Sequence, residues 1–197
     1  MMDVDTSAED ITALALALVG EFAAVQDNID GFVNLYAQRR APSLFGYLKR
    51  QNVLTRLPDR ERPNLLLAIA DEMKLDGDRS KFKDVYHRVK SVRDAIAHAA
   101  DMKRVDGNDL RLTRSVWSGA GALRGDQPTV TQVTREQLRL RLHDARWLLQ
   151  HVRYVIGADD LIFRMHYKGD QLVFVQPPAD PSDWDGAEFA VARNRGD

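Results

Sequence analysis

Hydrophobic residues recur at helical spacing in two long stretches of the chain. In 81–102 they follow one another at intervals of three and four residues, at Phe82, Val85, Val89, Val92, Ile96 and Ala99. In 135–157 the same intervals connect Leu138, Leu142, Ala145, Leu149, Val152 and Ile156. One apolar face with this spacing is typical of an α-helix that packs among other helices. The pattern therefore predicts a helical bundle.

Capping residues and prolines mark where the helices begin. Side chains that accept a hydrogen bond from the first helical N–H groups, and proline in the first turn, are typical of helix starts. Thr6 or Ser7, Pro42, Asp59 and Thr134 hold such positions, and Gly157 is a suitable C-terminal stop. Together with the apolar pattern, these signals predict about five helices, near 8–38, 42–57, 60–75, 81–102 and 135–157.

Two other regions favour β-structure. "VDGNDLRLTRSVW" indicates a turn and a short strand, and the Gly-rich loop "SGAGALRGDQPT" follows it. After Asp160, "LIFRMHY" and "QLVFVQ" flank a short turn at 168–170, which predicts a hairpin. Beyond Pro177, prolines and charged residues indicate a tail with little structure. The predicted fold class is all-α, an antiparallel bundle of about five helices in 1–157 with a loop/strand insert at 104–133, a β-hairpin appendage at 158–176 and a flexible tail at 177–197.

Composition limits the classes of protein to consider. With 197 residues, of which 44% are hydrophobic, the chain can bury the core of one domain. Cysteine is absent, which excludes disulfides, thiolate catalysis and cysteine-bound zinc. The apolar run "ITALALALVGEF" is too short for a membrane span, and the acidic start lacks the basic region of a signal peptide. We expect a cytoplasmic protein without a membrane contact.

A polar stripe runs along the predicted helix at 81–102. At about 100° per residue, His87, Ser91, Asp94 and His98 fall on one face, opposite the apolar positions. Arg93 lies about 140° around the helix from His98. A stripe of this kind is most often the solvated face of a bundle helix. The pattern alone therefore does not identify a site.

Local charge adds a second observation. The formal net charge of the chain is −1, so no global excess of cations announces nucleic-acid binding. Between Arg79 and Arg93, however, six cations accompany a single acid, Asp84. A local positive patch of this kind attracts a phosphate backbone. No metal site is expected, since His143 and His151 lack an acid that would complete a ligand set.

The segment "RDAIAH" resembles the signature of the HEPN superfamily of helical domains. In that signature an arginine is followed by a polar residue, three further residues and a histidine. Here these are Arg93, Asp94, 95–97 and His98. The layout of 8–157 is also similar, because the motif closes a long helix that precedes an insert and a final helix. Only the six-residue motif is specific.

The resemblance implies a metal-independent endoribonuclease that works as a homodimer and needs no cofactor. His98 from each protomer would act as base or acid on RNA, and Arg93 would clamp the oxygens of the reacting phosphate. Asp94 would orient one of the two side chains. The products would be a 2′,3′-cyclic phosphate and a 5′-hydroxyl. The RNA on either side would be held by four side chains, His87, Lys90, Arg88 and Lys83.

Other interpretations remain open from the sequence. One is a HEPN-like module without catalysis that binds nucleic acid or a protein, and another is a plain helical scaffold. A nuclease of this type would suit cellular defence or a toxin system with an antitoxin or regulatory partner. Some HEPN toxins carry a tyrosine two residues after the histidine, which a partner nucleotidyltransferase modifies. Ala100 stands there in this chain, which argues against that form of control.

Overall fold

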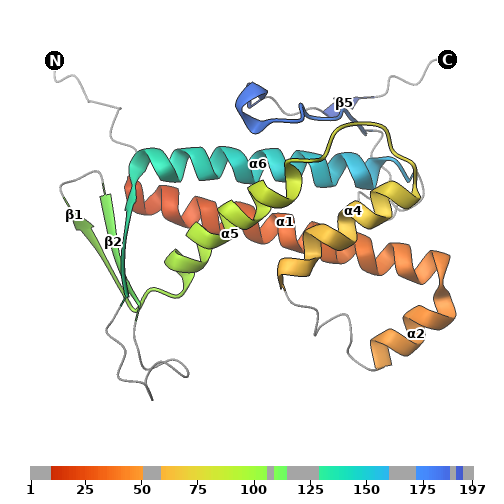
Figure 1. The fold of residues 1–197 in the computed structure, drawn as a ribbon, viewed down its shortest axis with the longest axis horizontal. Helices are drawn as coiled ribbons and strands as arrows, with labels where there is room; N and C mark the ends of the chain where they lie inside the picture. The colour runs from red at the N-terminus through yellow and green to blue at the C-terminus, as the bar shows by residue number, and fades with distance from the viewer. Residues whose placement is uncertain are drawn as a thin grey trace.

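The computed structural model describes residues 10–50, 59–105, 109–114, 129–159, 172–186 and 190–192. Its centre is formed by α1 (Ile11–Arg40) and α6 (Arg135–Gly157), which lie side by side (Figure 1). α1 buries a residue at every third or fourth position, the spacing of one helix face. These residues are Ile11, Leu14, Ala15, Leu18, Phe22, Val25, Ile29, Phe32 and Tyr36.

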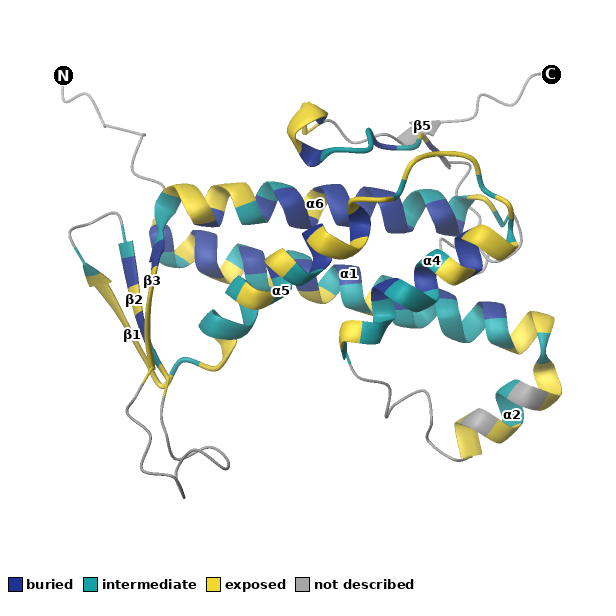
Figure 2. Ribbon diagram, in the orientation of Figure 1, coloured by how far each residue is buried: buried dark blue, intermediate teal, exposed yellow. Residues whose placement is uncertain are grey.

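The remaining helices pack around this pair. α2 (Pro42–Arg50) and α4 (Arg62–Glu72) contact α1, and a short 3₁₀ turn, η1 (Asp59–Glu61), leads into α4. α5 (Phe82–Ala97) contacts both α1 and α6 and buries Phe82, Val85, Tyr86 and Val89. Figure 2 shows the buried faces of α1, α5 and α6 turned toward one another. Five helices were predicted, and five are found in the described residues.

The helix starts follow the expected chemistry. Asp10 caps α1 by accepting a hydrogen bond from the Thr12 N–H at 2.8 Å, whereas the predicted caps Thr6 and Ser7 lie outside the described residues. Thr134 caps α6 and forms a reciprocal capping box with Gln137. The final helix therefore begins where the sequence predicted.

α5 ends earlier than expected, at Ala97 rather than near Met102. The Ala100 N–H donates to the carbonyl of Thr113 at 2.8 Å, and the next residues form strand β1 (Asp101–Val105). Pairing with a neighbouring strand thus replaces the last helical turn. As a result, His98 is the C-cap of α5 and not a residue within the helix.

The prediction of an all-α fold is wrong, because residues 101–105, just after α5, form a three-stranded antiparallel sheet with two strands of the insert. The strand order is β1-β2-β3, with β2 (Asp109–Arg114) between β1 and β3 (Thr129–Thr134). Leu110 and Leu112 of β2 and Val133 of β3 are buried on the face that meets the bundle. Their alternation with polar residues is the period of a half-buried strand. Only one short strand was predicted here from the sequence.

The predicted C-terminal hairpin is not supported. β4 (Leu172–Phe174) pairs antiparallel with β5 (Ala190–Ala192), and residues 160–171, which contain the other predicted strand, lie outside the described residues. Residues 174–186, partly within the predicted tail, pack along α6. Trp184 is buried beside the turn η3 (Pro181–Asp183). In the described parts of the chain, no helix is long and apolar enough to cross a bilayer.

Candidate functional site

α5 carries six of the seven predicted site residues and presents them on two flanks, and the seventh, His98, is its C-cap. Its buried residues face α1 and α6, so the remaining positions fall on either side of that contact. One flank carries Lys90 and Arg93 and faces Gln26 of α1 and Asp59 of η1. The other flank carries Arg88 and faces α6. The predicted residues therefore belong to different surroundings.

Arg93 is held inside the protein. Its guanidinium donates a 2.8 Å hydrogen bond to the Gln26 amide oxygen, lies 3.5 Å from a carboxylate oxygen of Asp59 and 2.9 Å from one of Asp94. The guanidinium carbon also lies 5.0 Å from the ring centre of Phe22, a cation–π distance. Only 18% of the side chain is exposed. Arg93 thus ties the C-terminal half of α5 to α1 and η1.

Asp59 is the centre of this network. Its carboxylate accepts hydrogen bonds from the Tyr86 hydroxyl at 3.0 Å, from Arg62 at 2.5 Å and from Gln26, and it lies 3.3 Å from the Lys90 ammonium. Burial acts to raise the pKa of Asp59. The hydrogen bonds from Tyr86 and Arg62 and the nearby positive charges outweigh burial, so the pKa lies below its ordinary value.

We use the name Asp59 cluster for Asp30, Asp59, Arg62, Lys90, Arg93 and Asp94. Arg62 bonds both carboxylate oxygens of Asp30, at 2.7 and 2.9 Å, and Lys90 pairs with Asp94. The three cations of the cluster thus meet three carboxylates. Burial of Tyr86 beneath the cluster, together with the charge of Asp59, raises the pKa of its hydroxyl. The cluster is electrically balanced and joins four elements of the fold.

His98 differs from Arg93, because its side chain is exposed. The residue caps α5 with its N–H donating to the Asp94 carbonyl at 3.0 Å, and its neighbour Ala97 is also exposed. Within the described residues the imidazole makes no hydrogen bond. The Asp94 carboxylate is bonded to Lys90 and Arg93, so it orients Arg93 rather than the histidine. The motif therefore consists of an anchored arginine–aspartate pair and an open imidazole.

The four residues expected to hold RNA differ in their exposure and in their ion-pair partners. Lys83 is exposed, and His87 is half-buried with its ring edge on Tyr86, at 5.8 Å between ring centres. Lys90 belongs to the Asp59 cluster. Arg88 pairs across the other flank with Asp144 of α6, at 3.4 Å. Lys90 is therefore neutralised within the chain, whereas Arg88 shares the carboxylate of Asp144 with a second arginine, Arg141.

The acidic and amide partners of these cations were not predicted from the sequence. Asp59 was assigned only as a helix cap, and Gln26 and Asp144 were not considered. No local signal identifies them, because each contact joins residues far apart in the chain: Gln26 and Arg93 are separated by 67 positions. The sequence contained one indication of such a contact, because Arg93 does not lie on the polar stripe but on a side of the helix that can face a neighbouring helix.

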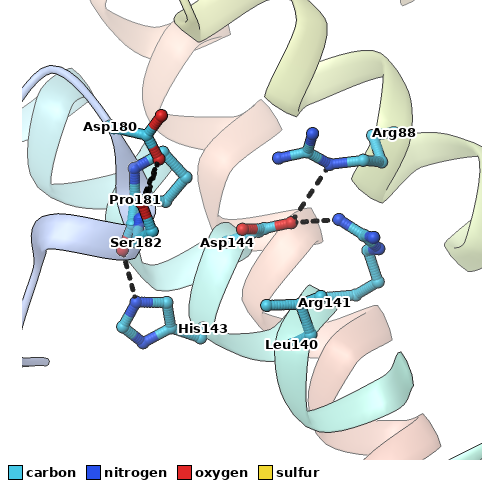
Figure 3. A pocket seen from close by; sticks show the side chains of 8 residues that line it. All are labelled: Arg88, Leu140, Arg141, His143, Asp144, Asp180, Pro181 and Ser182. Atoms are coloured by element: carbon cyan, nitrogen blue, oxygen red, sulfur yellow. Dashed lines mark hydrogen bonds and ion pairs between the residues drawn. The ribbon is translucent and has the colours of Figure 1, made fainter. Parts of the chain in front are cut away.

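A second polar surface lies on the Arg88 flank. Figure 3 shows Arg88 and Arg141 on the same carboxylate, that of Asp144, beside the C-terminal segment at 180–182. Ser182 and Asp180 of that segment line the same hollow. Among the described residues, no group of three histidine, aspartate or glutamate side chains is arranged to hold a metal ion.

Comparisons with known proteins give no relative for this chain. No protein-family model, no curated protein and no solved structure matches it. Membership of the HEPN superfamily therefore stays a prediction from the sequence, based on Arg93, Asp94 and His98 and on the helical layout around them.

Proposed function

We propose that this protein is a metal-independent endoribonuclease in which His98 carries out the proton transfers. The observation that supports this proposal is the exposed imidazole at the end of α5, directly after the anchored Arg93–Asp94 pair. The flanking Ala97 and Ala99 are small, so an RNA strand can approach the ring. Histidine suits proton transfer near neutral pH because its ordinary pKa lies there.

The reaction would use the 2′-hydroxyl of the RNA itself. A base takes the proton from this hydroxyl while its oxygen attacks the adjacent phosphorus, and an acid gives a proton to the departing 5′-oxygen. The products are a 2′,3′-cyclic phosphate and a free 5′-hydroxyl. One histidine cannot hold both protonation states at once. We therefore place one His98 from each of two chains at a shared site.

Arg93 has a positioning role in this proposal. Its guanidinium is already occupied by Gln26, Asp59 and Asp94, so it holds the end of α5 in place. The carboxylates of Asp59 and Asp94 already offset its charge, which weakens its attraction for a phosphate. The expected effect of Arg93 on cleavage therefore acts chiefly through the position of His98.

The test is cleavage of an end-labelled single-stranded RNA in EDTA. The parent should produce a cyclic phosphate end, and His98→Ala should not. An RNA with 2′-deoxyribose at the cleaved position should survive, because it lacks the nucleophile. Equal cleavage by the parent and His98→Ala would disprove the proposal.

A mixing experiment tests the shared site. Parent and His98→Ala chains are combined in varied ratios and allowed to exchange subunits. Activity should fall with the square of the parent fraction if each site needs two intact histidines. A linear fall would show that one chain suffices, and would contradict the two-chain site.

The balanced charge of the Asp59 cluster favours a second candidate function. Because Lys90 and Arg93 are neutralised within the chain, the protein could be a non-catalytic HEPN-like module that binds nucleic acid or a protein. Such a module would bind its partner equally well with His98→Ala and would cut no RNA.

A further inference from the structure

A polar groove runs between α5 and β3. Its central hollow, of about 390 Å³, is lined by Arg88, Ser91, Val92, Thr131, Gln132, Val133, Gln137 and Arg141. A second hollow of about 300 Å³ shares Ser91 and Thr131 with it and continues to Asp94 and Arg114. A third, of about 180 Å³, shares Arg88 and Arg141 and ends at the C-terminal segment. We call these three connected hollows the α5–β3 groove.

Two arginines from different helices meet in this groove on one buried carboxylate. Asp144 of α6 is 2% exposed and accepts from Arg141, three residues earlier on the same helix. It also lies 3.4 Å from the Nε atom of Arg88 on α5. In Figure 3 both guanidinium groups approach Asp144 from the same side. A buried carboxylate therefore holds two cations next to each other, against their mutual repulsion.

The charge of this triad is not balanced. Two guanidinium groups share one carboxylate, which leaves an excess of one positive charge, unlike the Asp59 cluster. Among the described residues, the lining of the central hollow contains no acidic side chain, but it contains the hydroxyls of Ser91 and Thr131 and the amides of Gln132 and Gln137. Arginine presents five N–H donors in a planar fork, and one carboxylate does not occupy the donors of two such groups. The remaining donors suit an anion with several oxygens.

We infer that Arg88 and Arg141 bind a backbone phosphate of single-stranded RNA in the α5–β3 groove. The choice of RNA as the source of the phosphate rests on the proposed function. From Arg88 to His98 is about 15 Å along the axis of α5, at 1.5 Å per residue. The groove continues in that direction to Asp94, one helical turn before His98. An RNA strand lying in it would place the bound phosphate a few nucleotides from the cleaved bond.

The experiment measures binding separately from cleavage. A fluorescent single-stranded RNA is titrated in EDTA against the full chain carrying His98→Ala, with or without Arg88→Gln. Arg88→Gln should weaken binding about tenfold, the size of a charged hydrogen bond to phosphate. It should also reduce the slope of log affinity against log salt by about 0.7, the value for one phosphate contact on a single strand.

The matched control is Lys49→Gln, which removes the same charge from exposed α2, remote from the groove (Figure 1). It should change the affinity less than twofold. If Arg88→Gln and Lys49→Gln weaken RNA binding equally, the inference is wrong. Binding of a poly-glutamate peptide is measured in the same way. If Arg88→Gln weakens the binding of this peptide as much as that of RNA, the groove binds an acidic protein instead. That result would also overturn the inference.

A second variant tests the groove while leaving the ion pairs of Asp144 intact. Ser91 is exposed in the groove, so Ser91→Glu places a carboxylate there without removing any partner of Asp144. It should abolish Arg88-dependent RNA binding, whereas the uncharged Ser91→Gln should retain most of it. Unchanged binding by Ser91→Glu would contradict the inference. Arg88-dependent binding without any cleavage by the parent would reject the proposed function and leave the inference standing.

Discussion

The guanidinium of Arg93 donates a hydrogen bond to the amide oxygen of Gln26, 2.8 Å away on the facing helix. This contact makes the arginine of the motif part of the packing between α5 and α1. The histidine of the same motif projects outside that packing. Arg93 therefore contributes to the packing of the folded protein, whereas His98, from the same short motif, does not.

Replacement of Arg93 should therefore lower stability. Arg93→Ala leaves Asp59 and Asp94 each without one cationic partner and uncovers the ring of Phe22. We expect a loss of about 2 kcal/mol in the free energy of unfolding, less than for a fully buried pair because the carboxylates are partly exposed. Urea unfolding at pH 7 measures this. The control is His98→Ala, at an exposed position, which should stay within about 0.5 kcal/mol of the parent. Equal losses for both variants would contradict the different roles.

Removal of Trp184 should destabilise the fold although it lies near the C-terminus. The ring is 5% exposed and lies 4.9 Å from the ring centre of His143 on α6. Trp184→Ala should cost about 3 kcal/mol, as for other buried aromatic residues. Thermal unfolding by calorimetry measures the change, with the exposed Asp183→Ala as the control. A melting temperature unchanged by Trp184→Ala would mean that residues 177–186 form the loose tail that the sequence predicted.

Stability should depend on the pH through His151. Burial and, to a smaller extent, the charge of Arg79 lower the pKa of this imidazole to about 4, against the opposing effects of the Pro178 carbonyl and Asp78. Between the ordinary pKa of 6.5 and about 4, the unfolded chain binds a proton that the folded chain does not. Stability therefore falls as the pH falls through this window, by about 2 kcal/mol between pH 7 and pH 5.

The neutral variant His151→Gln isolates this contribution. Its free energy of unfolding should change less between pH 7 and pH 5 than that of the parent, by about the same 2 kcal/mol. Urea titrations at both pH values give the difference. Parallel pH profiles for the two proteins would show that His151 does not titrate in this range.

Two glycines should respond in opposite ways to alanine. Gly20 lies within α1 with open space around it, so Gly20→Ala should stabilise the protein by up to about 1 kcal/mol. Gly77 has a φ of +110°, and an added Cβ would clash with the Gln176 side chain. Gly77→Ala should destabilise by more than 1 kcal/mol, from backbone strain. Addition of Gln176→Ala to this variant should remove the clash with the side chain but not the backbone strain. A neutral effect of Gly77→Ala would contradict backbone strain at this position.

The helices were predictable because their determinants are local. Apolar spacing and the Thr134 cap identify α6, and Pro42 marks the start of α2, without reference to any other part of the chain. The sheet was harder to predict from the sequence. β1 begins within what looked like a continuing helix, since Asp101 and Met102 have no strand signal of their own. Their pairing with Thr113 and Leu112 is a tertiary contact, and it overrides the helical tendency of the segment.

The candidate site shows the same limit. The apolar pattern placed its histidine in the last turns of a helix expected to run to Met102, and the polar stripe put the side chain on the face away from the core. The acidic partners of the cations could not be predicted in this way. Arg88 and Arg93 differ little in local context, yet one turns to Asp144 on α6 and the other to Asp59 before α4. Which acid each one meets depends on how the helices cross.

The hydrogen bond from Ala100 to Thr113 fastens the backbone just after His98 to the middle strand of the sheet. On the other side, the His98 N–H is bonded to the last turn of α5. The histidine therefore occupies a short bridge that is anchored at both ends, and its ring is free to turn while its Cα stays in place. Substitutions or length changes in the connection from β2 to β3 should leave this residue where it is, so the chain can diversify there without moving the imidazole.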